Sequence, residues 1–499
     1  MTEAATSAQQ EEGSGDLFGR GMVYVVVWSM QMIIATVVSP ILAHTLPLEE
    51  FGALAAAIAL YQLLIVVTVL GLDQALEMQR VNDRSATRSR GLLAAGIVFA
   101  FAVTTILALT SQWWGPALGF GDTTLPGLPI GGGLVFVTLL WTAPGASVLL
   151  VLSMLQAEDR LARFAIISIL STVGGLAFGL GLLFLVERSA LGYAWGGVIA
   201  QFAALGLGLI WTRPRWTGDM VTVRRAVALG VPLALASLAQ FVLAAGDRFA
   251  IQRMLGEAET ARFQVAFTVG NVLTLLLTFT NRAWLPRLKR IVDVGERWRT
   301  IQQARDGIHL LLGWAILGVT LGSPVLLRIF APASYRPDDL LVVVLVVGLC
   351  AVPVASSAAS GQLLITVGRS IPLGVAAGVA VVVKVVLTVA LLPPAGLVGA
   401  AVATLAALVA QAGYLVWSAS RTRAAELPDP RVWVFLAVVI VVAWCSLLLP
   451  TDLPWLIGRF TAGLLLLIPF ARAFLRLRNG QPPFGVRQSG TDSVDNSAG

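Results

Sequence analysis

The sequence predicts an all-α polytopic membrane protein with about fourteen transmembrane helices, arranged as two six-helix lobes related by a pseudo-twofold axis and two C-terminal helices. Three observations support this prediction. Apolar residues make up 57% of the chain and charged residues only 12%. Apolar runs of about 20 residues, long enough to cross a bilayer as helices, recur from end to end. Finally, Gln31 aligns with Gln240, and Asp73 with Arg282, at the same shift of 209 positions, which indicates an internal repeat.

Each expected helix is an apolar run bounded by polar or turn-forming residues. The expected spans are 18–43, 52–79, 91–111, 131–156, 164–186, 190–211, 226–252, 261–284, 306–330, 339–366, 370–392, 396–418, 432–449 and 456–474. Because each repeat holds an even number of helices, both lobes should have the same orientation in the membrane. The expected parts are a disordered cytoplasmic N-terminus, an N-lobe, a C-lobe, the last two helices and a disordered cytoplasmic tail, at residues 1–17, 18–213, 224–420, 431–475 and 476–499.

Basic residues gather in the loops on one side of the membrane. Arginines occupy the loops after the second, sixth and eighth expected helices, whereas the loops 44–51 and 112–130 contain no basic residue. This is the positive-inside pattern, and it places both termini in the cytoplasm. It also explains the formal net charge of +7 without nucleic acid as a partner, leaving membrane lipids as the expected neighbours.

Polar side chains within the apolar runs are the first group of candidate site residues, because such groups are costly in a bilayer unless they are paired or face water. A polar stripe on one face of span 261–284 has partners on neighbouring helices, which predicts a hydrated substrate cavity. The candidate cavity residues are Gln31, Gln240, Gln264, Thr268, Asn271, Thr274, Thr278 and Lys384. The alternative is hydrogen bonding between helices, worth about 0.6 kcal/mol for each bond.

Charged and polar residues toward the helix ends form a second group, expected to contact a substrate headgroup or to form a gate. These candidates are Arg20, Asp73, Glu77, Arg80, Asp247, Arg248, Asn281 and Arg282. Because the repeat places Asp73 opposite Arg282, these two are hypothesised to form a cytoplasmic gate, paired when the protein faces outward. The alternative for Asp73 is a local partner, Arg80. Lys384 in mid-helix could hold a phosphate, titrate during transport, or extend toward the membrane surface.

Several features argue against an enzyme. The chain has no Gly-rich phosphate loop followed by Lys and Ser or Thr, so it is not expected to hydrolyse ATP. Its loops are too short to hold a soluble catalytic domain. No cofactor or metal is expected, and transport would be coupled to a proton or sodium gradient.

Short motifs at the helix ends resemble those of a known family. They lie at Gly19–Gly21, Leu46–Gly52, Leu70–Asp73, Gly246–Phe249, Met254–Glu257 and Pro286. Over roughly residues 18–420, the chain resembles the polysaccharide biosynthesis proteins, the lipid-linked oligosaccharide flippases of the multidrug/oligosaccharidyl-lipid/polysaccharide exporter superfamily.

The resemblance implies a V-shaped cavity and alternating access that moves an undecaprenyl-diphosphate-linked oligosaccharide or polysaccharide repeat unit across the bacterial inner membrane. It also implies polysaccharide polymerase and glycosyltransferases as partners. Arg20, Arg80, Arg282 and Lys384 could supply cations for the diphosphate.

The alternatives are an ion-coupled multidrug or metabolite antiporter and a peptidoglycan lipid II flippase of the same superfamily. Acids near the helix ends argue against the antiporter, and a single lysine within the helices argues against lipid II. A membrane glycan ligase or polymerase would be expected to show a large outer loop with clustered acids.

Overall fold

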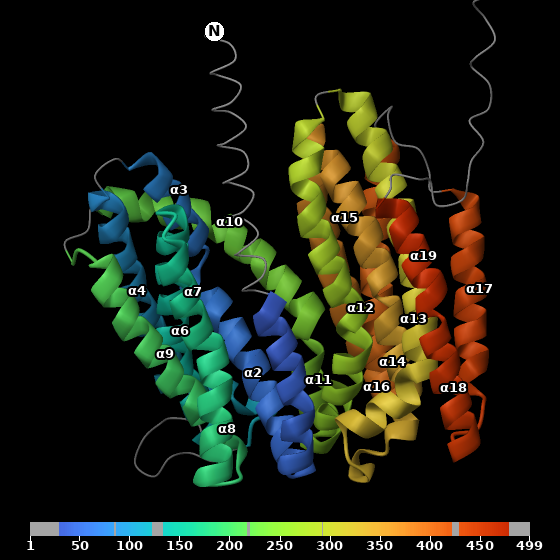
Figure 1. The fold of residues 1–499 in the computed structure, drawn as a ribbon. Coiled ribbons are helices and arrows are strands. Elements are labelled where there is room, and N and C mark those ends of the chain that lie inside the picture. The colour runs from blue at the N-terminus through green and yellow to red at the C-terminus, as the bar shows by residue number, and fades with distance from the viewer. Residues whose placement is uncertain are drawn as a thin grey trace, which may run out of the picture. The chain divides into compact units, whose positions relative to one another are not determined.

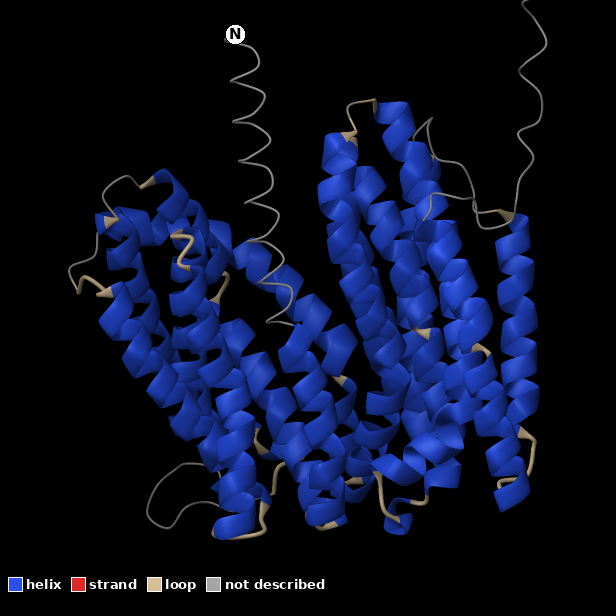
Figure 2. Cartoon of the chain, viewed as in Figure 1, coloured by secondary structure: helices blue, strands red, loops and turns tan. Residues whose placement is uncertain are grey.

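The computed structural model describes residues 29–83, 86–121, 133–216, 220–291, 293–421 and 429–478, without the side chains of 276, 278–290, 294 and 478. All regular secondary structure in these ranges is helical (Figure 2). Most of the two termini expected to be disordered, and Arg20, lie outside the described residues.

The chain divides into two compact units, which are described separately. The first comprises residues 1–268, 327–340 and 377–407, and the second comprises 269–326, 341–376 and 408–499. The division into lobes at residues 213–224 remains a prediction.

The first half of the chain supplies most helices of the first unit (Figure 1). After a helix at Ser29–Thr45 come α2 (Leu48–Val69), α3 (Leu72–Asn82), α4 (Thr87–Leu109), α5 (Ser111–Trp114), η1 (Pro116–Leu118), α6 (Gly133–Ala157), α7 (Leu161–Ile169), η2 (Leu170–Gly174), α8 (Gly175–Leu185), α9 (Ala190–Thr212), α10 (Met220–Ala245) and α11 (Asp247–Leu255). The short η3 (Ala333–Tyr335) and η4 (Pro337–Leu340) also belong to this unit.

The second unit contains the remaining helices. They are α14 (Leu341–Leu349), α15 (Ala351–Thr366), α17 (Pro430–Leu447), α18 (Leu453–Leu465) and α19 (Leu467–Arg478). Three long helices run through both units: α12 (Glu257–Arg290), α13 (Val294–Phe330) and α16 (Ile371–Ser420).

The fold class is confirmed. Among the described residues, 11 helices are long and apolar enough to cross a membrane. One of these, α16, contains Gly396 with non-helical backbone angles and so accounts for two expected spans. The apolar helix Ser29–Thr45 and the 34-residue α12 account for two more, which completes the expected set.

The second expected span is broken rather than continuous. Leu70 and Gly71 both have positive φ, 50° and 71°, and they separate α2 from α3. At this joint the backbone of Gly71 lies against the backbone of Gly230 in α10. A Cβ on either glycine would overlap the backbone of the opposite segment. Glycine is required here both for the left-handed conformation and for the close approach. The expected continuous helix over 52–79 was therefore wrong at this point.

The ninth expected helix begins earlier than hydropathy suggests. Helix α13 starts at Val294 instead of 306. The Asp293 carboxylate accepts a hydrogen bond of 2.7 Å from the backbone N–H of Glu296, which caps the first turn. A polar turn can extend a helix beyond the apolar run, and hydropathy detects only the apolar run.

The core of the first unit is centred on α6. Its Leu150, Val151, Met154 and Leu155 are almost completely buried among α3, α4, α7 and α9. Small residues allow close helix contact nearby, where Gly196 of α9 lies against the backbone of α8 at Gly179. Packing of this kind, and not water exclusion, holds helices together in lipid.

The core of the second unit lies between α13, α14, α15 and α17. Ile316, Leu345 and Val439 are buried there. Gly313 of α13 contacts the ring of Phe435, which allows α17 to pack closely. The first of the two additional C-terminal helices is thus an integral part of this unit.

Candidate functional site

A buried ion pair joins α11 to α16 within the first unit. The Lys384 Nζ donates hydrogen bonds to Asp247 Oδ2 at 2.9 Å and to the Leu243 carbonyl at 2.6 Å. Thr404 Oγ1 lies 3.0 and 3.2 Å from the two oxygens of the same carboxylate. The exposed fractions of Asp247, Lys384 and Thr404 are only 1%, 2% and 7%. Two charges are therefore removed from solvent and compensated within a single hydrogen-bonded group.

Local sequence explains how these side chains meet. Asp247 occupies the first turn of α11, where a negative charge is favoured by the exposed N–H groups of the helix. In α16, Pro393 and Pro394 precede Gly396, whose φ of 55° reverses the chain. Gly399 then lies against the backbone of Leu391, so the two arms of α16 run close together. Lys384 is on the first arm and Thr404 on the second, and both reach one carboxylate.

Arg248 lies beside this pair and has a different set of partners. Its Nε donates to Gln264 Oε1 of α12 at 2.7 Å, and its guanidinium lies 4.5 Å from the centre of the Phe267 ring. Gln264 Nε2 in turn donates to Thr268 Oγ1 at 3.3 Å. The first two members of the expected polar stripe are thus joined to each other, and Gln264 also holds a buried arginine.

The other candidate cavity residues are more dispersed. Gln31 Nε2 donates to Ser168 Oγ of α7 at 2.7 Å, while Gln240 of α10 is exposed. Asn271 and Thr274 are half-buried on α12. The side chains of Thr278, Asn281 and Arg282 lie outside the described residues, so the gate between Asp73 and Arg282 remains a prediction.

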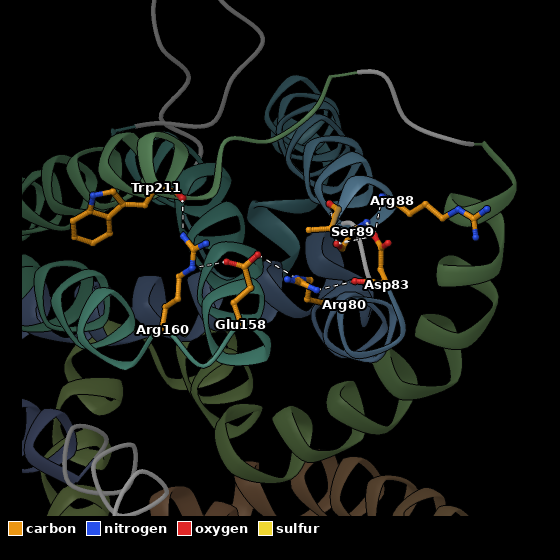
Figure 3. A network of polar contacts seen from close by, with 8 residues as sticks. Arg80, Asp83, Arg88, Ser89, Glu158, Arg160 and Trp211 are labelled. Carbon is orange, nitrogen blue, oxygen red and sulfur yellow. Dashed lines mark hydrogen bonds and ion pairs between the residues drawn. The ribbon is translucent and has the colours of Figure 1, made fainter. Parts of the chain in front are cut away.

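Arg80 belongs to a polar network at one end of the first unit (Figure 3). Glu158 accepts from Arg80 Nε at 3.1 Å and from Arg160 Nε at 2.8 Å, and Arg160 also donates to the Trp211 carbonyl at 3.4 Å. Figure 3 shows the Glu158 carboxylate between the two guanidinium groups. Asp73 and Glu77 lie half-buried on α3. The local partner shown for Arg80 is thus Glu158 and not Asp73.

Asp83 completes this network. Its carboxylate accepts from the backbone N–H groups of Arg88 and Ser89 at 2.9 and 3.0 Å, and so caps α4. Arg80 Nη1 donates to the Asp83 carbonyl at 2.8 Å. The network therefore ties the end of α3 to the starts of α4 and α7.

The chain segments at residues 48–52, 119 and 252–262 meet at another end of the first unit. Gly52 of α2 lies against the Glu257 carbonyl, and Gly119 lies against the backbone of Arg253. Gln252 Nε2 donates to the Glu257 carboxylate at 3.3 Å. Burial and then the nearby charge of Glu49 raise the pKa of Glu257, against the effect of that hydrogen bond. We call this group of contacts the α11 closure.

Arg262 is anchored close to the α11 closure. It donates to Glu259 at 2.8 Å, to Asp339 at 3.0 Å and to the Tyr335 carbonyl at 3.0 Å. Glu259 and Asp339 therefore balance the positive charge of Arg262. This arginine is one of the few basic residues expected on the side of the membrane where the loops contain almost none. Burial raises the pKa of Tyr335, whose ring packs edge-on against Phe51.

Two residues of these polar groups, Thr404 and Glu158, are not among those predicted from the sequence. Thr404 is a polar residue within an apolar run, so the criterion that selected Lys384 could have included it. Glu158 stands among other charged residues in the loop at 157–160, and nothing in that local pattern distinguishes a buried acid from a solvated one. Among the described residues, there is no group of three or more side chains suited to hold a metal ion.

Comparison with known sequences identifies one family. The profile of the family described as "Polysaccharide biosynthesis protein" matches residues 20–292, which is more than half of the chain. No curated protein sequence matches the chain.

Solved structures share the fold at low sequence identity. A lipid II flippase MurJ in an inward closed conformation is 13% identical with a TM-score of 0.64, and the alignment covers 91% of this chain and 100% of that one. A multidrug resistance MATE family transporter of the MOP superfamily, facing inward, is 12% identical with a TM-score of 0.60, covering 79% and 96%. The eukaryotic MATE transporter AtDTX14 is 15% identical with a TM-score of 0.52, covering 84% and 97%.

Proposed function

The chain belongs to the polysaccharide biosynthesis protein family, and we propose that it is a flippase for an undecaprenyl-diphosphate-linked oligosaccharide or polysaccharide repeat unit. It would act by alternating access in the bacterial inner membrane, with both termini in the cytoplasm. A fold shared with transport proteins agrees with the expectation that the chain is not an enzyme. Polysaccharide polymerase and glycosyltransferases are the proposed partners.

The state of Asp247 is the observation that favours this substrate class over a small cation. A carrier of cationic drugs needs an acid that is free to meet its substrate. Asp247 is instead buried and held by Lys384 and Thr404. Its charge is already compensated within the protein.

The polar network around Glu158 carries charges that could bind an anionic headgroup. Arg80 and Arg160 share the single carboxylate of Glu158, so this group of three carries one net positive charge. Both arginine side chains are partly exposed, at 23% and 36%. Guanidinium groups bind diphosphate oxygens through paired hydrogen bonds, which supports a role for this network in capturing the substrate.

A transport assay tests the proposal directly. The protein is reconstituted into vesicles that contain a fluorescent undecaprenyl-diphosphate-linked oligosaccharide, and an external quencher reports which leaflet holds the lipid. Protein-dependent exchange between the leaflets is expected, and double substitution of Arg80 and Arg160 by glutamine should slow it. The matched control is Arg328→Gln, which removes a different exposed arginine paired with Asp338.

A cellular experiment separates a flippase from a ligase or polymerase. Deleting the gene should leave the lipid-linked glycan in the inner leaflet, where a lectin added to spheroplasts cannot reach it. Accumulation in the outer leaflet would instead support an enzyme that acts after translocation.

Lipid II is the second candidate substrate. The observation in its favour is that the alignment with the lipid II flippase covers 91% of this chain, against 79% for the first MATE transporter. Lipid II added to the vesicle assay should compete with the oligosaccharide lipid only if this alternative is correct.

A further inference from the structure

We propose that the arginine-rich end of the first unit is a docking surface for the acidic segment at residues 1–17 of the same chain. The surface lies where α3 and α9 end and where α4, α7 and α10 begin. Its exposed members, which we call the arginine face, are Arg88, Arg163, Arg213, Arg215, Arg224 and Arg225. The proposal goes beyond the proposed transport function and does not depend on it.

Contacts between neighbouring helix ends bring the arginine face together. The backbone N–H of Arg215, just after α9, donates to the Arg90 carbonyl of α4 at 3.2 Å. The Arg163 guanidinium of α7 lies 5.7 Å from the centre of the Trp211 ring in α9. Near the start of α10, Ala226 belongs to the same apolar cluster as the buried residues of α3. Five helix ends therefore present their arginines on one side of the unit.

These arginines carry more positive charge than the neighbouring acids balance. The described side chains at this end include nine arginines and five acids, which leaves a net charge of +4. The arginines are the arginine face with Arg80, Arg90 and Arg160, and the acids are Asp73, Glu77, Asp83, Glu158 and Asp159.

Four members of the arginine face have no acidic partner in the described part of the chain. The ion pairs at this end join Glu158 to Arg80 and Arg160, and leave Arg88, Arg163, Arg224 and Arg225 without a carboxylate among the described residues. In Figure 3, the Arg88 guanidinium points away from the carboxylates beside it. The surface can therefore bind further carboxylates without breaking the network around Glu158.

Residues 1–17 have the complementary charge. They contain four acids and no basic side chain, and the first basic residue of the chain is Arg20. The acids are Glu3, Glu11, Glu12 and Asp16. A guanidinium binds a carboxylate through two parallel hydrogen bonds, so a surface of arginines suits a peptide that carries several carboxylates.

The chain leads from the acidic segment to the same end of the unit. Gln31, near the start of the helix Ser29–Thr45, donates to Ser168 of α7. Ser168 follows Arg160 by eight residues, or about 12 Å along the helix. Residues 18–28 would span about 16 Å as a helix and up to about 38 Å fully extended. The acidic segment can thus reach the arginine face in either case.

Anionic lipid headgroups are the other source of negative charge at such a surface. Two observations favour the acidic segment. Its attachment through residues 18–28 gives it an effective concentration on the order of millimolar at the arginine face. Its four acids also match the net charge of +4 on the described side chains.

A distance measurement in neutral lipid tests the docking. Spin labels are placed on cysteines at Ala8, between the acids, and at exposed Ala162, beside Arg163, after Cys350 and Cys445 are changed to alanine. Electron–electron resonance in phosphatidylcholine nanodiscs gives the ratio of short to long distances, and so of docked to free segment. Short distances should dominate in about 0.1 M salt and disappear in about 1 M salt, where the screening length falls to about 3 Å.

Neutralising the acids should release the segment. The quadruple variant E3Q/E11Q/E12Q/D16N should lower the docked-to-free ratio roughly tenfold, as expected when several exposed ion pairs are lost together. The matched control is D492N/D495N, which removes two acids near the other end of the chain and should leave the ratio unchanged.

The arginines have their own pair of variants. R224Q/R225Q should lower the docked-to-free ratio by about threefold, a smaller effect because the other arginines remain. R328Q/R336Q removes two exposed arginines outside the arginine face and should not change the ratio.

Docking has a consequence for transport, which rests on the proposed function. The docked acids would lie beside Arg80 and Arg160 and compete there with a diphosphate headgroup. In the vesicle assay at low substrate concentration, the quadruple variant should therefore exchange the lipid-linked oligosaccharide several-fold faster than the unmodified protein. Absence of exchange in both proteins would count against the transport function and not against docking.

Nanodiscs that contain anionic phosphatidylglycerol decide between the segment and the lipid. Short distances that persist there and disappear in the quadruple variant would support the proposal. Three results would overturn it: no short distances in neutral lipid, displacement of the segment by phosphatidylglycerol, or an equal docked-to-free ratio with and without the four acids. No transport substrate is present in these measurements, so they are independent of whether the protein moves a lipid-linked glycan.

Discussion

The ion pair of Lys384 with Asp247 and the polar network around Glu158 each contain a buried carboxylate, but they balance its charge in different ways. Asp247 meets a single lysine, and both are almost fully buried. Glu158 is also buried, but it meets two arginines that remain partly exposed. The first arrangement keeps both charges away from water, whereas the second leaves its two cations in contact with water. The difference indicates that the charge of Asp247 is balanced entirely within the protein, whereas the arginines around Glu158 can also be solvated.

The largest effect is expected from Lys384→Met. It leaves Asp247 buried without a positive partner, which costs about 3–5 kcal/mol. Thermal unfolding in detergent should show a large loss of stability at neutral pH. The D247N/K384M double variant should recover most of it, and a double variant as unstable as the single one would show that the lysine matters for packing and not for charge.

Glu158→Gln should have a smaller effect. It removes both ion pairs of the network, yet Arg80 and Arg160 can turn toward water, so we expect a loss of about 1–2 kcal/mol. Denaturant unfolding provides the measurement, with Arg328→Gln as an exposed control. A loss of stability as large as that of Lys384→Met would show that both buried carboxylates depend equally on their ion pairs.

Thr404→Val sharpens the comparison within the buried pair. It removes one hydrogen bond to Asp247 but keeps the lysine, and should cost about 1 kcal/mol. Thermal unfolding in detergent provides the measurement. A loss of stability as large as that of Lys384→Met would mean that the threonine is as important as the lysine for holding the carboxylate.

The smallest effect is expected from Glu257→Gln. The pKa of Glu257 is raised by burial and by Glu49, so folding favours its protonated form. The ionised Glu257 carboxylate destabilises the fold by its full amount above the raised pKa. This destabilisation disappears as the pH falls below the ordinary glutamate pKa. The unmodified protein should therefore gain stability relative to Glu257→Gln as the pH falls from neutral to about 4. A stability difference that does not change with pH would contradict this assignment.

Most of the helices and both members of the buried pair can be predicted from the sequence, but their pairing cannot. Lys384 and Asp247 are 137 positions apart, and the repeat aligns Asp247 with Val38 and Lys384 with Gly175. Repeat symmetry relates equivalent positions, so it suggested Asp73 with Arg282 and gave no reason to join helices of a single lobe. The contact depends on the reversal at Gly396, which hydropathy detects only as a break between two apolar runs.

The α2–α3 joint was hidden for a related reason. Leu70 and Gly71 lie within an otherwise regular pattern, and one glycine in an apolar run is common in membrane helices. Only the approach of α10 shows why the helix is interrupted there.

The backbone contact between Gly71 and Gly230 determines how closely α10 approaches the α2–α3 joint. The two backbones meet directly at these glycines, while Val69 and Leu72 beside the joint lie in the same apolar cluster as Ala226 of α10. A single added methyl group would force the two backbones apart. The crossing therefore depends on the absence of a side chain at both positions, although only one of the two glycines has a positive φ.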